Sequence, residues 1–463
     1  MTETATAQVS IDAPGTDTPH PGGALGQFSW ALFDGGRGPY STLVNVFVFS
    51  AYFSTVVISD PVRGQATWSY LTSVAALLVA IGAPILGAIA DAGGRRKPWI
   101  VGCLILGAPC MAALWYATPH LPAGFSWVLL APIGATLAFE FSGIFGNAML
   151  PNIAPRARLG FLSGLGFALS SVLTIFLFLF FLLAWSWNPR PLFGVDVAAH
   201  EPERLVGLIA ALSFLLCSLP CLAFTPDSPR TSLGMRAAVS RGLRSLGRTL
   251  TQLGSFRNAA LFLGARIIFN EGFLVLMMFT GVFAAGVLHW TPEMLIIQGL
   301  INSVVATFAG FLAGWLDRRT GSKRALLTFI GGSVVATLVL CSVTPHSILT
   351  IEIAPPTNSA YGLFATLPDK VFVVTQAFVA LLVTGGFVTS RSLMAKVAPR
   401  AMLNEFFGLY AVSGTASSFI GPLAIAVLTS AFHSQRAGVA VGIVFLLVGG
   451  FVLTKVRESL NAS

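Results

Sequence analysis

Residues 160–186 read GFLSGLGFALSSVLTIFLFLFFLLAWS, a run of 27 residues without one charged side chain. As a helix this run is about 40 Å long at about 1.5 Å per residue, which exceeds the roughly 30 Å of hydrocarbon in a bilayer. A helix that is apolar on every side belongs in a large protein core or in a membrane. The stretch therefore predicts a membrane span.

Similar apolar stretches lie on both sides of this one. Across the chain 55% of residues are hydrophobic and 10% charged, whereas a soluble domain usually carries about 25% charged residues. We predict an all-α membrane protein with twelve transmembrane helices, surrounded by the lipid bilayer. The expected spans are residues 28–57, 68–90, 99–118, 124–150, 160–186, 204–224, 258–288, 293–316, 325–343, 370–390, 406–430 and 436–454.

The net charge of +9 alone is compatible with nucleic-acid binding, so the positions of the basic residues along the chain matter more than their number. Twenty of the 27 lie in one set of alternate gaps, counted with the central linker and the C-terminal tail, and five lie in the opposite set. Cytoplasmic loops carry the excess of Lys and Arg, so both termini are expected in the cytoplasm and no nucleic-acid partner is needed.

The gaps also divide the chain. We predict six-helix bundles at 28–224 and 258–454. A disordered cytoplasmic tail is expected at 1–27, and a second cytoplasmic tail at 455–463. The polar segment 225–257 is interpreted as a cytoplasmic linker, in which leucines recur at helical spacing among arginines and predict an amphipathic helix on the inner leaflet.

Two pairs of loops repeat. GAIADAGGRRKPW at 87–99 corresponds to GWLDRRTGSKRAL at 314–326, with an offset of 226 residues. APRARLGFLSG at 154–164 corresponds to APRAMLNEFFG at 398–408, with an offset of 244 residues. The difference is absorbed by the longer gap near 344–369. Two halves of equal polarity predict parallel repeats with a substrate site near the midplane between them.

The first of these loops resembles the major facilitator signature G-x-x-x-D-R-x-G-R-R through Gly87, Asp91, Gly94, Arg95 and Arg96, with Ala92 in place of the usual basic residue. More narrowly, the chain is similar to the vacuolar amino-acid effluxer-like branch, which has many bacterial members. The segments that carry this resemblance are 30–34, NAMLPNIA at 147–154, IFNEGF at 268–273 and SRSLMAKVAPRAMLNEFFGLY at 390–410.

The resemblance implies a major facilitator fold in a bacterial inner membrane and transport of a small solute, with an amino acid and efflux as candidates. Two departures concern the substrate region. The usual D-W-x-N-S of span 1 is replaced by Asp34, two glycines, Arg37 and Gly38, and the usual N-D-G of span 7 is Asn270, Glu271 and Gly272.

Ionisable residues within spans are costly and are therefore candidates for function. Glu140 and Glu271 each lie too deep to reach water along their own helix, and we expect them to face one central cavity. Each is a candidate for proton coupling or substrate binding, with an interhelical hydrogen bond or ion pair as the alternative. Asn270 belongs to the same candidate cavity. Arg266, nearer the cytoplasmic end, is expected to extend toward the interface.

Asp34 and Arg37 stand three residues apart, so they can pair within one helix. The pair is interpreted as embedded, beside glycines and Pro39 that loosen the helix, although an interfacial position ahead of a shorter span is the alternative. Arg37 is a candidate for binding a substrate carboxylate or for holding an acid ionised.

A cytoplasmic gate is expected where the loop after span 2 approaches the start of span 11. Glu405 is the acid there, and we hypothesise that it meets Arg95 or Arg96 when this side is closed. Asp91 and Asp317 end helices at equivalent places in the two halves and complete the predicted gate.

No G-x-x-x-x-G-K-[ST] phosphate loop, HExxH or GxSxG motif occurs, and the five cysteines lack the paired spacing of a zinc site. We therefore expect neither a cofactor nor a metal, and no enzyme. The leading hypothesis is a monomeric secondary transporter of a small polar or zwitterionic solute, driven by protons or another ion. The alternatives are a sensor built on a transporter fold and, less well supported, a membrane enzyme.

Overall fold

The computed structural model describes residues 23–119, 123–227, 240, 256–353, 362–399 and 402–458. Within these residues twelve helices are long and apolar enough to cross a membrane, as predicted. These spans contain the α-helices α1 (Gly23–Gly36) and α2 (Phe49–Tyr52), which share one span, α3 (Pro61–Gly93), α4 (Lys97–Ala113), α5 (Ala131–Ile153), α6 (Arg156–Phe181), α7 (Glu201–Phe224), α9 (Arg257–Val287), α10 (Pro292–Thr320), α11 (Ser322–Ser342), α12 (Leu367–Val397), α13 (Leu403–Ser417) and α14 (Ile420–Phe432), which share another, and α15 (Gln435–Thr454).

Two spans are interrupted. Span 1 continues from α1 through the π-helical segments η1 (Tyr40–Phe47) and η2 (Phe53–Val57), with α2 between them. Pro39 precedes η1 and has no backbone N–H, so the regular hydrogen-bond ladder cannot run through it. Span 11 consists of α13 and α14, which are separated at 418–419. Irregular backbone at membrane depth is tolerated where it is buried in protein or lines a cavity.

The predicted boundary differs from the observed one at the N-terminal end of the chain. Helix α1 begins at Gly23, inside the segment predicted as a tail, and Gly26 in its first turn is buried against the end of α7, where a Cβ atom would lie 3.1 Å from the Phe224 carbonyl oxygen. The rest of the predicted tail and most of the linker at 225–257, with its expected amphipathic helix, lie outside the described residues.

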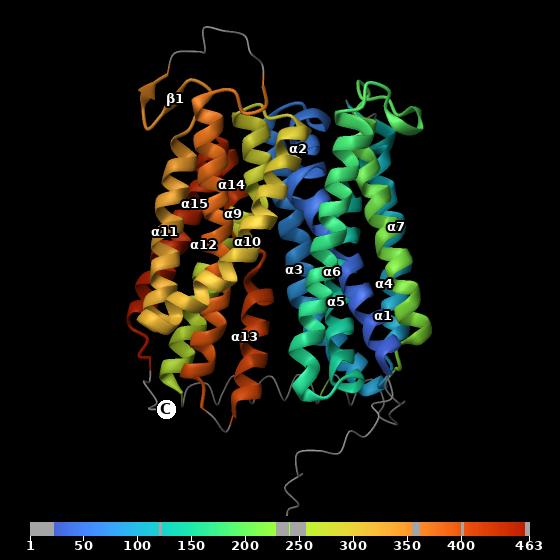
Figure 1. Ribbon diagram of the computed structural model, residues 1–463, viewed down its shortest axis with the longest axis vertical. Helices are drawn as coiled ribbons and strands as arrows, with labels where there is room; N and C mark the ends of the chain where they lie inside the picture. The colour runs from blue at the N-terminus through green and yellow to red at the C-terminus, as the bar shows by residue number, and fades with distance from the viewer. Residues whose placement is uncertain are drawn as a thin grey trace, which may run out of the picture.

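The spans form two groups that stand side by side (Figure 1), with α1–α7 in one half and α9–α15 in the other. A short antiparallel hairpin, β1 (Ser347–Ile348) with β2 (Ile351–Glu352), lies at one end of the bundle, here called the hairpin face. The opposite end, where α15 finishes and residues 455–458 follow, is called the terminal face.

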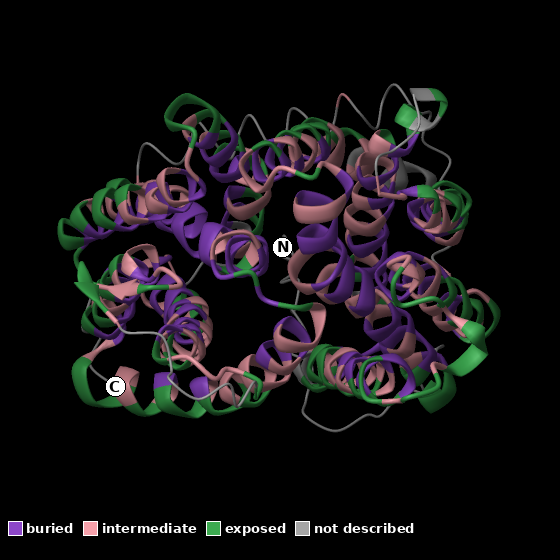
Figure 2. Ribbon diagram, turned by 90° about the horizontal axis from the view of Figure 1, so that it is seen from above, coloured by how far each residue is buried: buried purple, intermediate pink, exposed green. Residues whose placement is uncertain are grey.

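Exposed positions follow the outer circumference of the bundle, and buried ones lie inside (Figure 2). Many exposed side chains are large and apolar, such as Phe167 at 73% and Phe311 at 76% exposed. A soluble protein rarely exposes a continuous apolar surface of this extent, whereas hydrocarbon chains cover it at no cost. The outward-facing surface therefore fits lipid.

The internal repeat extends to side-chain contacts at the terminal face. In the first half, the Asp227 carboxylate accepts hydrogen bonds from the backbone N–H groups of Arg96 (2.7 Å) and Lys97 (3.2 Å) at the start of α4. In the second half, Glu458 accepts from the N–H groups of Ser322 (3.0 Å) and Lys323 (3.0 Å) at the start of α11.

The matching lysines make matching bonds as well. Lys97 Nζ donates to the carbonyl of Leu222 (2.7 Å), and Lys323 Nζ donates to the carbonyl of Thr454 (2.6 Å). The two lysines are 226 residues apart, the offset of the sequence repeat. In each half, an acid that follows the last span thus caps the N-terminus of the third span, α4 or α11, where the helix dipole favours negative charge.

Described hydrogen bonds between the halves extend from the hairpin face to the middle of the bundle. Gln65 Nε2 of α3 donates to Thr429 Oγ1 (2.8 Å) and to the carbonyl of Gln435 (3.1 Å). Deeper along α3, Ser73 Oγ donates to the carbonyl of Phe419 (2.9 Å). These contacts join α3 to α14 and α15 and hold the halves together toward the hairpin face.

Candidate functional site

A cavity of about 340 Å³ lies between the two halves. It has the size of a small-molecule site and combines an apolar wall with a few polar side chains. Both halves contribute to it, from η1, α3 and α5 on one side and from α9, α13 and α14 on the other. Its lining residues are Asn45, Trp68, Thr72, Ala76, Val79, Thr136, Glu140, Arg266, Asn270, Leu274, Met278, Phe279, Ala411, Gly414, Thr415, Ser418 and Pro422.

Arg266 lines this cavity, contrary to the expectation that it extends toward the interface. It is 7% exposed, and its Cζ atom lies 3.6 Å from the centroid of the Tyr410 ring. Nη1 donates to Ser413 Oγ (2.5 Å). The ring and the hydroxyl of span 11 hold the guanidinium inside the protein, which sequence spacing within span 7 could not show.

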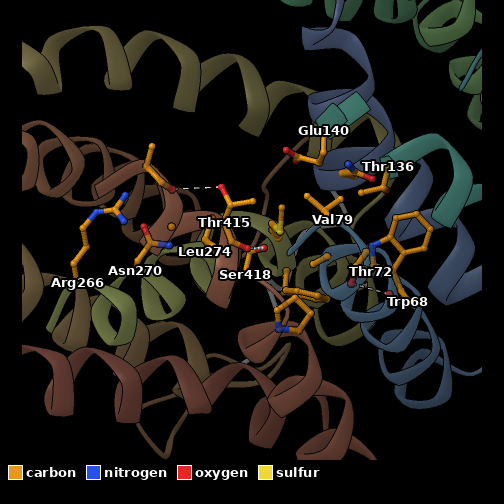
Figure 3. A pocket seen from close by; sticks show the side chains of 17 residues that line it. Trp68, Thr72, Val79, Thr136, Glu140, Arg266, Asn270, Leu274, Thr415 and Ser418 are labelled. Atoms are coloured by element: carbon orange, nitrogen blue, oxygen red, sulfur yellow. Dashed lines mark hydrogen bonds between the residues drawn. The ribbon is translucent and has the colours of Figure 1, made fainter. Parts of the chain in front are cut away.

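Glu140 lies on the other side of the same cavity, in α5 (Figure 3). Figure 3 shows it near Thr136, whereas Arg266 and Asn270 lie across the space on the opposite half. Among the described residues, the Glu140 carboxyl group has no hydrogen-bond or salt-bridge partner. An acid and a base from different halves therefore face one cavity.

Asp34 and Arg37 form the predicted pair, with Arg37 Nη1 3.1 Å from Asp34 Oδ1. Arg37 also donates to Ser142 Oγ (3.1 Å) and to the Phe139 carbonyl (2.8 Å), and its Cζ lies 4.5 Å from the Phe139 ring centroid. These partners flank Glu140 in α5, so the pair is embedded rather than interfacial. Neither residue lines the cavity, and the cation there is Arg266.

Glu271 is 1% exposed and also does not line the cavity, although its neighbour Asn270 does. The carboxylate accepts hydrogen bonds from Ser417 Oγ (2.7 Å) and from the backbone N–H of Gly421 (2.9 Å). The expectation that Glu140 and Glu271 face one cavity is therefore wrong for Glu271. Of the two alternatives for this residue, the interhelical hydrogen bond is the arrangement found, and the ion pair is not found among the described residues.

The predicted gate residues are only partly described. The side chains of Asp91 and Glu405 lie outside the described part, so the contact of Glu405 with Arg95 or Arg96 stays a prediction. Arg95 is exposed, and Asp317 forms a salt bridge with Lys396 (3.1 Å) inside the second half.

Sequence reasoning missed Asp227 and Glu458, which cap helices at the terminal face, and Lys396, which bonds Glu458 (3.1 Å). It also gave no role in the cavity to Trp68, Thr415 or Ser418. The position of an acid a few residues beyond the last span of each half was a usable signal for the first two.

Comparison with known proteins identifies the family. Residues 156–459 match the family described as vacuole effluxer Atg22 like. The chain belongs to this family. A relative in Bacillus subtilis strain 168, the MFS-type transporter YxiO, is 24% identical over 435 residues, which cover 93% of this chain and 94% of the relative. The protein is accordingly a major facilitator transporter, and the resemblance stated from the sequence is confirmed.

Fungal members are similar over a shorter region. Autophagy-related protein 22 of Yarrowia lipolytica is 24% identical over 278 residues, which are 54% of this chain and 44% of the fungal protein. This chain thus matches less than half the length of that Atg22-like relative.

Solved structures show the same fold. A mutant of the nucleoside transporter NupG has a TM-score of 0.63 at 14% identity, and the match covers 94% of this chain and 99% of the NupG chain. A bacterial homologue of the human lysosomal transporter Spinster, in an inward-facing and unoccupied conformation, has a TM-score of 0.63 at 17% identity, covering 95% and 97%. YxiO and the two solved neighbours are named as transporters or homologues of one, and the expectation of a non-enzymatic membrane protein is met.

Proposed function

We propose that this protein is a proton-coupled secondary transporter that exports a small zwitterionic solute of the amino-acid type. The observation that carries the proposal is the pair of opposite charges, Glu140 and Arg266, that line one cavity from different halves. A zwitterion can bind the two at once, its carboxylate to the guanidinium and its ammonium group to the carboxyl side chain. Export is supported by the family's description as effluxers.

Neighbouring polar groups suit such a solute. Asn45 Oδ1 is buried and has no hydrogen-bond partner among the described residues, although it lines the cavity. Buried polar atoms are normally paired, so a bound solute or water is the expected partner. Asn270, Thr415 and Ser418 provide further donors and acceptors on the opposite half.

Coupling follows from competition for one carboxyl group. A protonated Glu140 binds an ammonium group much more weakly than the ionised form does, because the neutral carboxyl group lacks the opposite charge. If the side chain carries a proton in one direction and the solute in the other, the proton gradient drives export. Each charge that crosses the membrane is worth about 2.3 kcal/mol per 100 mV, which is enough to concentrate a solute about 50-fold. Arg37, which bonds Phe139 and Ser142 around Glu140, and its partner Asp34 would set the field in which Glu140 exchanges its proton.

The orientation proposal places the terminal face in the cytoplasm, because most basic residues lie in the loops of that side. With the halves joined toward the hairpin face, the structure then corresponds to a cavity closed from outside. Closure at the terminal face would bring Glu405 to Arg95 or Arg96, beside Asp91, with Asp317 at the equivalent place in the other half. A reporter fused after Ser463 that is active only outside the cytoplasm would reject this orientation.

Transport is tested by reconstituting the protein, which we propose acts as a monomer, into liposomes and measuring counterflow of labelled amino acids. Counterflow at equal pH and accumulation against a pH gradient are both expected. Counterflow without any response to a pH gradient would reject proton coupling. Binding of an amino acid without counterflow would favour a sensor.

A further inference from the structure

Span 11 is interrupted beside the cavity, and its sequence explains where. Pro422 has no backbone N–H and so cannot bond the carbonyl four residues earlier, that of Ser418. Helix α13 ends at Ser417, α14 begins at Ile420, and the N–H of Ser418 donates to the carbonyl of Thr415 (3.4 Å), three residues back. A kink with such a cause is a defined joint in the span.

Glu271 bridges this joint from span 7. One carboxylate oxygen accepts from Ser417 at the end of α13, and the other accepts from Gly421 in the first turn of α14. A Cβ atom at position 421 would lie 2.9 Å from Glu271 Oε2, so the glycine is what allows the close approach. The acid therefore ties together the two segments that Pro422 separates.

The other half of the protein contacts the same joint. Ser73 Oγ donates to the carbonyl of Phe419, the residue between the two segments. Beyond the joint, α14 packs along α3 of the first half and on α15 and α9 of its own half, and α13 also contacts α3. A movement that separates the halves toward the hairpin face must therefore break the bond between Ser73 and the joint.

The joint also borders the cavity. Thr415 and Ser418 lie at the end of α13 and line the cavity together with Pro422. A solute bonded to either hydroxyl acts on the turn that Glu271 holds. The cavity-lining hydroxyls of Thr415 and Ser418, the joint at 418–419 and the bond between the halves at Phe419 thus lie within a few residues of one another.

We propose that Glu271 is a positioning residue that bridges the joint of span 11 and orients Thr415 and Ser418 toward the solute. Through this bridge, solute binding in the cavity affects the hydrogen bond between Ser73 and Phe419. The proposal rests on the transport function above and assigns Glu271 a role other than carrying the proton.

Exchange kinetics separate the two roles. Glu271→Gln keeps the volume but leaves one amide oxygen to accept where two oxygens did, and Ser417→Ala removes one donor without altering the acid. We expect both variants to slow solute exchange at equal pH by about tenfold, which corresponds to about 1.4 kcal/mol, with an unchanged midpoint of the pH profile. Glu352→Gln, in the exposed hairpin, is the matched control and should exchange like the parent.

A proton carrier would give the opposite pattern. Glu271→Gln would then abolish accumulation driven by a pH gradient, exchange at equal pH would survive, and Ser417→Ala would behave like the parent. That result, or parental rates in both variants, overturns the positioning role. If Glu271→Gln does not fold, Ser417→Ala still decides the matter.

Labelling tests the joint without any solute. In a protein whose native cysteines are replaced, Thr72→Cys places a thiol in the cavity, to be labelled with an impermeant maleimide in cells and in inverted vesicles. We expect Glu271→Gln and Ser73→Ala to raise labelling from the hairpin side severalfold. Unchanged labelling in both contradicts the proposal. If no solute is exchanged but labelling changes, the proposed function fails and the joint stands.

Discussion

The guanidinium of Arg266 lies over the ring of Tyr410, with 3.6 Å between Cζ and the ring centroid, and so joins span 7 to span 11 at the wall of the cavity. Tyr410 contacts the cation through the face of its ring and not through its hydroxyl group, which donates to Ser390 Oγ (3.2 Å). A cation held in this way keeps its remaining N–H donors for a solute.

Replacing the ring should weaken solute binding. A cation–π contact contributes about 1 to 2 kcal/mol, so Tyr410→Leu is expected to raise KM by a factor between about 5 and about 30. Tyr410→Phe retains the ring and should change KM by much less. Initial rates of counterflow against solute concentration measure both, and equal KM values in the two variants would contradict a role for the ring.

Removing the cation should have the larger effect. Arg266→Ala leaves the solute carboxylate without its partner in a site of low dielectric, a loss of about 2 kcal/mol or more. We expect KM to rise by about 30-fold or more, and Arg266→Lys to restore part of the affinity through charge alone. Arg63→Ala, an exposed arginine on the hairpin side, serves as the control. A parental KM in Arg266→Ala would reject the zwitterion site.

Glu140→Gln should uncouple transport. The amide fixes a neutral side chain at nearly constant volume, so the pH gradient should no longer drive accumulation, although exchange at equal pH persists at a lower rate. Accumulation and exchange are measured in the same liposomes, with Glu352→Gln as the control. Full gradient-driven accumulation in Glu140→Gln would require another residue to carry the proton.

Glu458 should stabilise the second half in a pH-dependent way. Burial acts to raise the pKa of its carboxyl group, but hydrogen bonds from the Lys323 N–H, the Lys396 ammonium and the Ser322 N–H hold this pKa below its usual range. Because the folded-state pKa is lowered, the contribution is present above the unfolded pKa of about 4.3 and disappears as pH falls through the folded value.

We therefore expect Glu458→Gln to lower the free energy of unfolding at pH 7 by about 1.5 to 3 kcal/mol, the range for hydrogen bonds to a charged group. Thermal unfolding in detergent between pH 7 and pH 3 measures the difference, which should shrink toward the acid end. A difference that is constant over this range would contradict the electrostatic origin.

His200, at the hairpin side, should stabilise the fold with the opposite pH dependence, so that its contribution is lost as pH rises. Its hydrogen bond from Nδ1 to the Glu203 carboxylate (3.2 Å) raises the pKa of the imidazole, against the effect of burial. A raised folded-state pKa gives stability that is complete below the unfolded pKa of about 6.5 and is lost as pH rises through the folded value. His200→Gln should thus lower Tm at pH 5.5 but not at pH 9, and an equal loss at both pH values would reject the ion pair.

Much of the fold follows from the sequence. Twelve apolar runs, the sorting of basic residues and the loops repeated at an offset of 226 residues together predict two six-helix halves, because the bilayer demands long, internally hydrogen-bonded segments wherever the chain crosses it. The pair of Asp34 and Arg37 was predictable for a similar reason, since residues three apart on a helix are neighbours.

Only the tertiary structure decides what the buried charges face. Glu140 and Glu271 have the same signature in sequence, an acid deep inside a span, yet one lines the cavity and the other bridges the joint of span 11. Rotation of a helix about its axis and the choice of its neighbours depend on packing across spans far apart in the chain. Arg266 shows the same limit, because the ring and hydroxyl that hold it come from span 11, and no spacing within span 7 encodes them.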